Sequence, residues 1–109
     1  MRLGEFSISL AVKDIKKSLA FYEKLGFEVM DGDVKQKWVM LQNGQAKIGL
    51  FQDMFEDNVI TFNPPDVREI EDQLKAQGVK LVKASEGEEG PAHIVVKDPD
   101  GNSILLDQF

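Results

Sequence analysis

Hydrophobic and polar positions along the chain alternate in short runs, interrupted by two stretches with helical spacing. Large apolar residues alternate with small ones over 6–12, which predicts a strand with one buried face. Apolar residues then recur every three or four positions between Asp14 and Gly26. This pattern predicts an amphipathic helix that Asp14 caps and Gly26 ends. Three further strands are predicted after it, at 27–30, 36–41 and 47–52.

The second half of the chain repeats this order of elements. We predict a strand at 59–63, a helix that Asp66 caps and Gly78 ends, and strands at 79–82, 92–97 and 103–107. Asp14 precedes Gly26 by twelve residues, and Asp66 precedes Gly78 by the same twelve. The sequence therefore indicates an internal duplication, with modules 1–55 and 56–109 in one domain of residues 1–109.

Strand side chains point alternately to the two faces of a sheet, so the pattern predicts what each face carries. One set is almost wholly aliphatic and is expected to pack against the helices: Ile8, Leu10, Val12, Ile48, Leu50, Ile60, Phe62, Ile104 and Leu106. The opposite set mixes small, polar and aromatic side chains, as a partly hydrated ligand pocket does. We predict a ligand-binding cleft lined by Ser7, Ser9, Trp38, Met40, Gly49, Phe51, Val59, Thr61, Asn63, His93, Leu105 and Asp107.

Composition narrows the classes of function. The 109 residues include no cysteine, which excludes disulfides and thiolate chemistry and favours a reducing, cytoplasmic location. A net charge of -6 disfavours binding to nucleic acid. No apolar run reaches the roughly 20 residues of a membrane span, so we expect no membrane association.

Two segments resemble a known family. The first holds Val12-Lys13-Asp14, Ser18, Phe21-Tyr22 and Leu25-Gly26-Phe27, and the second is Asp98-Pro99-Asp100-Gly101-Asn102. Both are similar to the vicinal oxygen chelate superfamily, which contains glyoxalases, bleomycin resistance proteins and dioxygenases. The resemblance implies an α+β fold in which two tandem βαβββ modules form curved mixed sheets, of eight strands in all, around a cleft. It also implies a homodimer.

The resemblance also implies where a metal would bind. Metal-dependent members of the superfamily hold a divalent cation with His and Glu side chains from four strands. The corresponding positions here are Ser7, Gly49, Val59 and Leu105. None of these residues can replace an imidazole or a carboxylate as a ligand. We therefore expect no metal site of the family's kind and no cofactor.

Three cleft residues are candidates for chemistry. Trp38 is the only tryptophan, and it either stacks a planar ligand or fills a core or dimer interface. His93 is the only histidine, and it acts either as a general base or simply as a half-exposed strand residue. Asp107 is the other candidate proton carrier.

Three functions are consistent with this sequence. The first, which we favour, is a small-molecule binding or sequestering protein similar to the bleomycin resistance members. The second is an enzyme of the superfamily, a glyoxalase, lyase or dioxygenase-like protein, that works without a metal or with an atypical metal site. The third is a partner-binding protein that keeps the fold but fills the pocket with its own side chains.

Overall fold

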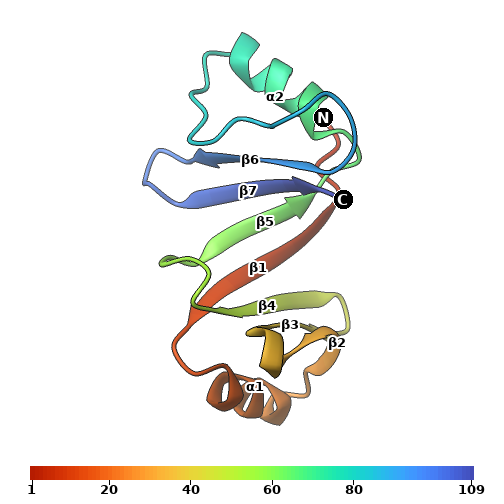
Figure 1. Ribbon diagram of the computed structural model, residues 1–109, viewed down its shortest axis with the longest axis vertical. Helices are drawn as coiled ribbons and strands as arrows, with labels where there is room; N and C mark the ends of the chain where they lie inside the picture. The colour runs from red at the N-terminus through yellow and green to blue at the C-terminus, as the bar shows by residue number, and fades with distance from the viewer. The chain divides into compact units, whose positions relative to one another are not determined.

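Seven strands and two helices make up the fold in the computed structural model, which describes residues 1–109 (Figure 1). The elements are β1 (Glu5–Val12), α1 (Ile15–Lys24), β2 (Glu28–Asp33), the short 3-10 helix η1 (Val34–Gln36), β3 (Trp38–Asn43), β4 (Ala46–Gln52), β5 (Val59–Asn63), α2 (Val67–Ala76), β6 (Ala92–Lys97) and β7 (Ser103–Gln108). The residues divide into two compact units. The first unit is Ser7–Val59, and the second is Ile60–Phe109 together with Met1–Phe6.

In the first unit, the strands lie in the order β2-β3-β4-β1. β1 runs parallel to β4, whereas β3 is antiparallel to both of its neighbours. The core consists of Ile15 from α1 and of Val39, Leu41 and Leu50 from the sheet, all buried. Partly buried residues predicted to meet the helix pack against this core, namely Leu10, Val12 and Ile48. The prediction of an aliphatic face covered by a helix is confirmed for this unit.

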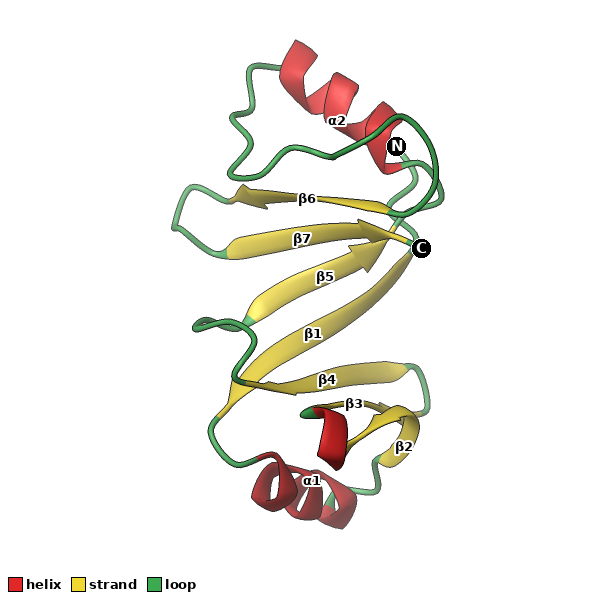
Figure 2. Cartoon of the chain, viewed as in Figure 1, coloured by secondary structure: helices red, strands yellow, loops and turns green.

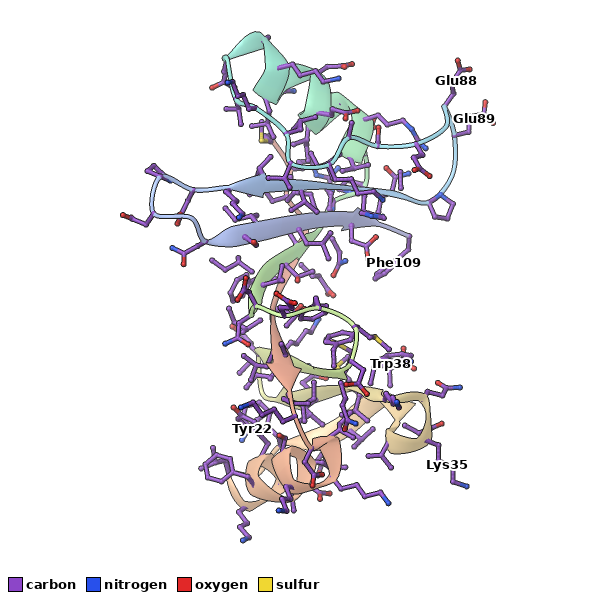
Figure 3. All side chains as sticks on the ribbon, turned by 60° about the vertical axis from the view of Figure 1, so that its left-hand side comes forward. Tyr22, Lys35, Trp38, Glu88, Glu89 and Phe109 are labelled. Carbon is purple, nitrogen blue, oxygen red and sulfur yellow. The ribbon has the colours of Figure 1, made fainter.

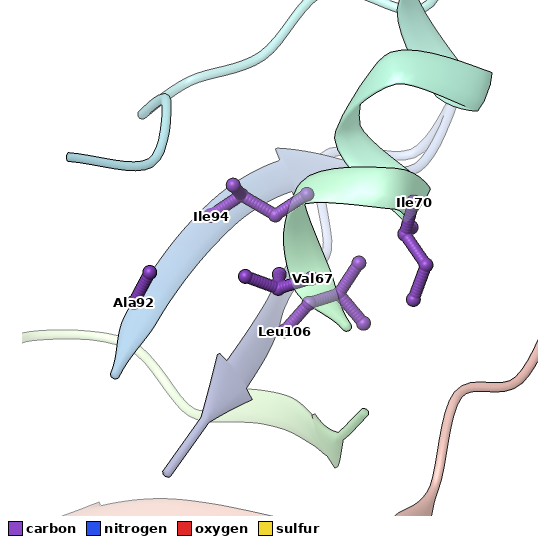
Figure 4. Close-up of a cluster of buried hydrophobic side chains, with 5 residues drawn as sticks. All are labelled: Val67, Ile70, Ala92, Ile94 and Leu106. Atoms are coloured by element: carbon purple, nitrogen blue, oxygen red, sulfur yellow. The ribbon is translucent and has the colours of Figure 1, made fainter. Parts of the chain in front are cut away.

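In the second unit, the strands lie in the order β5-β7-β6, and α2 covers one face of them (Figure 2). Figure 4 shows the core between this helix and the sheet, which is made of Val67, Ile70, Ala92, Ile94 and Leu106. Phe62 and Ile104 pack against it, as the strand alternation predicts. Each unit therefore buries its own aliphatic face under its own helix.

Both helices begin at the residues that the sequence predicts. Asp14 accepts a hydrogen bond from the backbone N–H three positions later at 3.2 Å, and Asp66 does the same at 3.2 Å. These side chains satisfy one of the unpaired N–H groups at each helix start. Gly26 and Gly78, the predicted stop signals, follow the helices with φ of +91° and +81°. The two helices are therefore capped and ended in the same way.

The predicted strand at 79–82 is wrong. This segment holds no strand, and only Lys83 forms an isolated bridge to Val95. Val79 and Val82 are 37% and 59% exposed, so these two side chains do not belong to a buried sheet face. The second module is therefore βαββ, and the expected eight strands in two four-stranded sheets become seven strands. Curved sheets were expected, but neither unit's sheet curls strongly (Figure 2).

The other boundaries differ by a few residues. The second strand was predicted to end at residue 30, but β2 continues for three more residues to Asp33, with a register shift between Val29 and Asp31. η1 ends at Gln36, the first residue of the predicted third strand, so β3 begins two residues late, at Trp38. Asp33 caps η1 by accepting a hydrogen bond from Gln36 N at 3.0 Å. Neither α1 nor α2 has the length and apolar character that crossing a membrane would require.

Candidate functional site

The first unit carries an aromatic surface on the sheet face turned away from α1. Trp38 of β3 lies opposite Phe51 of β4, and the next row pairs Met40 with Gly49, without any register shift. The Trp38 and Phe51 rings are nearly parallel, at 9°, with centroids 6.4 Å apart. Phe55 tilts against Phe51 with centroids 5.3 Å apart. We call Trp38, Met40, Phe51 and Phe55 the aromatic platform; the position of Trp38 can be followed in Figure 3.

Two glycines let the platform lie close to the backbone. A Cβ atom on Gly49 would stand 2.5 Å from the Phe51 ring and 2.9 Å from Met40 Sδ. A Cβ atom on Gly32 would stand 2.7 Å from the Trp38 ring, and Gly32 has a φ of +75°, which also favours glycine. Gly49, a predicted cleft residue, therefore acts by leaving room for its neighbours.

The platform is accessible, whereas the adjacent serines are not. Trp38, Met40 and Phe51 are half-buried. Ser9 lies beside Gly49 in the sheet register, but Ser7 and Ser9 are only 4% and 5% exposed. The structure thus places the predicted serines inside the first unit and the predicted large side chains on its surface.

An open hollow borders the platform at Phe55. It has a volume of about 600 Å³ and is lined by Ala11, Val12, Lys13, Asp53, Met54, Phe55 and Glu56. Its mixed lining of apolar and charged side chains is typical of a small-molecule site, and its volume falls within the usual range of about 300–1,000 Å³. The segment after β4 therefore contributes both Phe55 of the platform and much of this hollow.

The second unit carries a separate polar cluster. His93 of β6 lies directly opposite Asp107 of β7. Lys83 Nζ is 2.7 Å from His93 Nε2. The sequence alone showed no partner for His93, whereas the structure supplies two. Lys83 was missed, because it follows a segment that reads as an ordinary strand and loop.

Asp107 is a half-buried carboxyl in this cluster. Burial raises the pKa of Asp107 above its usual value, and the nearby His93 opposes that rise. Asn63, another predicted cleft residue, donates through Nδ2 to the backbone carbonyl of Asp107 at 2.9 Å. The Asn63 amide therefore stabilises the pairing of β5 with β7 through this hydrogen bond. Leu105 lies opposite Val95 one row along the same face, and Thr61 is buried.

The donor groups do not fit a metal ion of the family's kind. No three His, Cys, Asp or Glu side chains gather closely enough to hold one. The four positions implied by the resemblance hold two aliphatic residues, a glycine and a buried serine, at Val59, Leu105, Gly49 and Ser7. Aliphatic side chains offer no lone pair to a cation. We therefore derive no chemistry through a metal.

Comparison with known proteins supports the fold and the family. The family model described as Glyoxalase/Bleomycin resistance protein/Dioxygenase superfamily matches residues 4–106. No curated protein sequence matches this chain. A superfamily member from Vibrio splendidus 12B01 is 19% identical, with a TM-score of 0.73 over 96% of this chain and 98% of that one.

Two further solved structures share the fold. A protein described as NAD-dependent benzaldehyde dehydrogenase from Legionella pneumophila is 18% identical, with a TM-score of 0.80 over 95% of this chain and 98% of that one. Methylmalonyl-CoA epimerase from Mycobacterium tuberculosis is 17% identical, with a TM-score of 0.68 over 98% and 87%. At such identities the likeness shows the fold alone. Because the family model covers nearly the whole sequence, the chain belongs to the glyoxalase/bleomycin resistance protein/dioxygenase superfamily.

Proposed function

We propose that this chain binds a small organic molecule on the aromatic platform, without a tightly bound metal. The observation that carries the proposal is the parallel arrangement of Trp38 and Phe51 on an accessible sheet face, over the space that Gly49 leaves. This surface is built for contact with a flat or apolar group. Binding or sequestering a compound would require no catalytic group on this surface.

The energetics of aromatic side chains support this role. Each large aromatic residue can bury about 150–250 Å², and an aromatic pair gains about 0.5–1.5 kcal/mol beyond that burial. Trp38 and Phe51 are both half-buried, so part of their surface is still available to a ligand. The hollow beside Phe55 adds volume and polar groups, including Lys13 and Asp53, that would orient a ligand.

The fluorescence of Trp38 can report binding at the platform, because Trp38 is the only tryptophan in the chain. We would titrate the protein with a panel of small planar aromatic compounds and follow the emission of Trp38. The proposal predicts saturable quenching or a spectral shift for at least one compound class. Phe51→Leu, which removes the stacked ring and keeps an apolar side chain, should weaken that binding by about tenfold, or about 1.4 kcal/mol.

Phe21→Leu is the matched control for this experiment. Phe21 is an aromatic residue of α1, 57% exposed, and its ring contacts Tyr22 with centroids 5.3 Å apart. Binding should be unchanged in this variant. Equal weakening by both substitutions, or no saturable response to any compound, would contradict the proposal.

A second candidate function is an enzyme that works without a metal, favoured by the pairing of His93 with Asp107 across β6 and β7. A carboxylate beside an imidazole is a common arrangement for general acid–base catalysis. If a substrate is found, His93→Ala and Asp107→Ala should each reduce its turnover. Turnover that survives both substitutions would remove this candidate.

A further inference from the structure

We propose that Lys83 is a carbonyl-reactive amine, with His93 as its proton acceptor and Asp107 beside the imidazole. This site lies in the second unit and shares no residue with the aromatic platform. It would take small aldehydes or ketones with an apolar substituent. The inference is independent of the proposed binding function, so either can fail without the other.

A hydrogen bond between Lys83 and His93 brings the amine within reach of a base. Lys83 Nζ lies 2.7 Å from Nε2 of His93. As an ammonium group Lys83 has hydrogens to donate and no lone pair, so Nε2 is the acceptor, and transfer of one proton to Nε2 leaves Lys83 as an amine with a lone pair. An amine within hydrogen-bond reach of a base is the arrangement expected of an activated nucleophile.

Backbone hydrogen bonds of the sheet hold both groups in place. The backbones of Lys83 and Val95 form two hydrogen bonds with each other. Lys83 N donates to Val95 O at 3.2 Å, and Val95 N donates to Lys83 O at 3.0 Å. His93 is two residues from Val95 in the same strand and lies opposite Asp107. The amine, the base and the carboxyl therefore come from three segments tied together by backbone hydrogen bonds. A fixed base with a carboxyl facing it completes the general pattern of such sites.

An apolar pair of side chains lies beside the polar cluster and would contact the ligand. Val95 and Leu105 form the next cross-strand pair on the face that carries His93 and Asp107. Both side chains are apolar and half-buried, so they offer a contact for a hydrocarbon substituent. A carbonyl compound held there would present its carbon to the amine. The cluster sets one cation, Lys83, against the acidic Asp107, so it has no excess positive charge to attract a polyanion, and a neutral carbonyl compound suits it better.

The reaction balances without any other reagent. His93 first takes a proton from the Lys83 ammonium group, which leaves a neutral amine. The amine lone pair attacks the carbonyl carbon, a C–N bond forms, and the π electrons move to oxygen, which takes that proton from His93. His93 then removes a second proton from nitrogen to give the neutral carbinolamine and passes it to the hydroxyl group, which leaves as water while the nitrogen lone pair forms the C=N bond. The product is a protonated imine between Lys83 and the ligand, and hydrolysis reverses it.

The experiment measures which lysine reacts first. Intact protein would be incubated with isobutyraldehyde and sodium cyanoborohydride, which traps each imine as a stable secondary amine. Digestion and mass spectrometry at successive times would then give a rate for every lysine. General acid–base assistance commonly contributes about 100-fold or more, so Lys83 should be modified far faster than exposed lysines such as Lys80.

Three variants make the test decisive. Lys83→Arg should remove the fast modification and leave the other lysines unchanged. His93→Gln keeps a hydrogen-bond acceptor but cannot carry a proton at neutral pH, so it should slow Lys83 to the rate of Lys80. Lys97→Arg, at the other end of β6, is the matched control and should leave Lys83 fast.

Thermal unfolding of each variant would confirm that the fold is intact before rates are compared. Uniform modification of all lysines in the wild-type protein would overturn the proposal. A fast Lys83 that is unaffected by His93→Gln in a folded variant would overturn the role of His93.

Discussion

Gln108 Oε1 accepts a hydrogen bond from the backbone N–H of Val67 at 2.8 Å, which joins the end of β7 to the first residue of α2. The first unit repeats this contact, because Gln52 Oε1 at the end of β4 accepts from Ile15 N at 3.0 Å. The first N–H groups of a helix have no partner within it, so each glutamine satisfies one of them. The two units thus share a way of tying a strand to a helix.

We predict that Gln108→Ala destabilises the fold by about 2 kcal/mol, because it removes two hydrogen bonds, the one from Val67 N and the one that Gln108 Nε2 donates to Gly90 O at 3.0 Å, each with a usual net value of about 1 kcal/mol. The substitution leaves the N–H of Val67 without its partner. Denaturant unfolding would measure the change in the free energy of unfolding. Gln45→Ala, at an exposed position in the turn before β4, is the control and should change it little. Equal effects of the two substitutions would argue against the strand-to-helix tie.

Gly49→Ala should disrupt the platform. The added Cβ would stand 2.5 Å from the Phe51 ring and 2.9 Å from Met40 Sδ, so these side chains must move. Overpacking of this kind costs about 1–3 kcal/mol. We expect lower thermal stability together with a change in the Trp38 emission, because Trp38 stacks on Phe51.

A double substitution identifies the cause of that loss. Phe51→Ala removes the ring that the new methyl group would meet, so Gly49→Ala should cost much less in that background. The coupling free energy from the four-protein cycle should then be about 1 kcal/mol or more. Additive effects would show that Gly49 acts through something other than Phe51.

The contact between Ser85 and Glu71 should make stability depend on pH. Burial pushes the pKa of Glu71 up, but hydrogen bonds from Ser85, aided by Lys75 and Arg68, outweigh it and leave the pKa below its ordinary value of 4.5. Ser85 Oγ donates to Glu71 at 2.6 Å and Ser85 N donates at 2.9 Å. Ser85→Ala should therefore cost about 1.5 kcal/mol at neutral pH.

The sign of the pH effect follows from the lowered pKa. Because the folded protein holds the Glu71 carboxyl deprotonated more readily than the unfolded chain does, this contribution is complete above pH 4.5 and is lost as the pH falls through the folded pKa. The difference in stability between wild type and Ser85→Ala should shrink below pH 4.5. A difference that stays constant down to pH 3 would contradict the assignment.

Arg68 should hold the acidic loop before β6. Its guanidinium group donates to the carbonyl oxygens of Glu86, Gly87, Glu89 and Gly90, at 3.0, 3.2, 3.2 and 2.9 Å. Figure 3 shows Glu88 and Glu89 pointing outward from this loop. Arg68→Lys cannot make the same set of bonds, because an ammonium lacks the planar fork.

We therefore expect faster cleavage of the Arg68→Lys variant by a glutamate-specific protease at 86–89. A loss of about 1.4 kcal/mol in loop closure would give about a tenfold faster rate. Arg2→Lys, which changes the only other arginine, is the control and should be cleaved like wild type. Unchanged cleavage of Arg68→Lys would show that the loop is held by other contacts.

Metal removal should not affect this protein. The family's ligand positions hold residues such as Gly49 and Leu105, and no acidic or imidazole cluster replaces them. We predict that the thermal midpoint is unchanged by excess chelator or by added Zn²⁺, Ni²⁺, Mn²⁺ or Fe²⁺. Stoichiometric metal in protein purified without an affinity tag, or a midpoint sensitive to chelator, would contradict this prediction.

Local patterns in the sequence were enough to predict most elements and both faces of each sheet. The caps Asp14 and Asp66 mark where the helices begin. The alternation along β3 and β6 determines which side chains share a face, because the paired strands contain no bulge there. Periodicity thus predicts that Trp38 and Phe51, or His93 and Asp107, share a face, whereas the strand register that sets the members of each pair opposite one another comes from the structure.

What periodicity could not predict is contact made by irregular backbone. The segment 79–83 contains apolar residues that suit a strand, yet it forms only one bridge, through Lys83. The contact of Lys83 with His93 depends on that bridge and leaves no mark in the sequence. The role of Gly49 was likewise invisible, because it depends on where the Phe51 ring lies.

The most direct test of small-molecule binding is a thermal unfolding screen with a library of aromatic, drug-like and thiol-conjugate compounds, run in parallel on wild type and Phe51→Leu. Our account predicts at least one compound class that raises the midpoint of wild type with a dependence on concentration, and does so much less for Phe51→Leu. Absence of stabilisation by any class, or equal stabilisation of both proteins, would contradict binding at the platform.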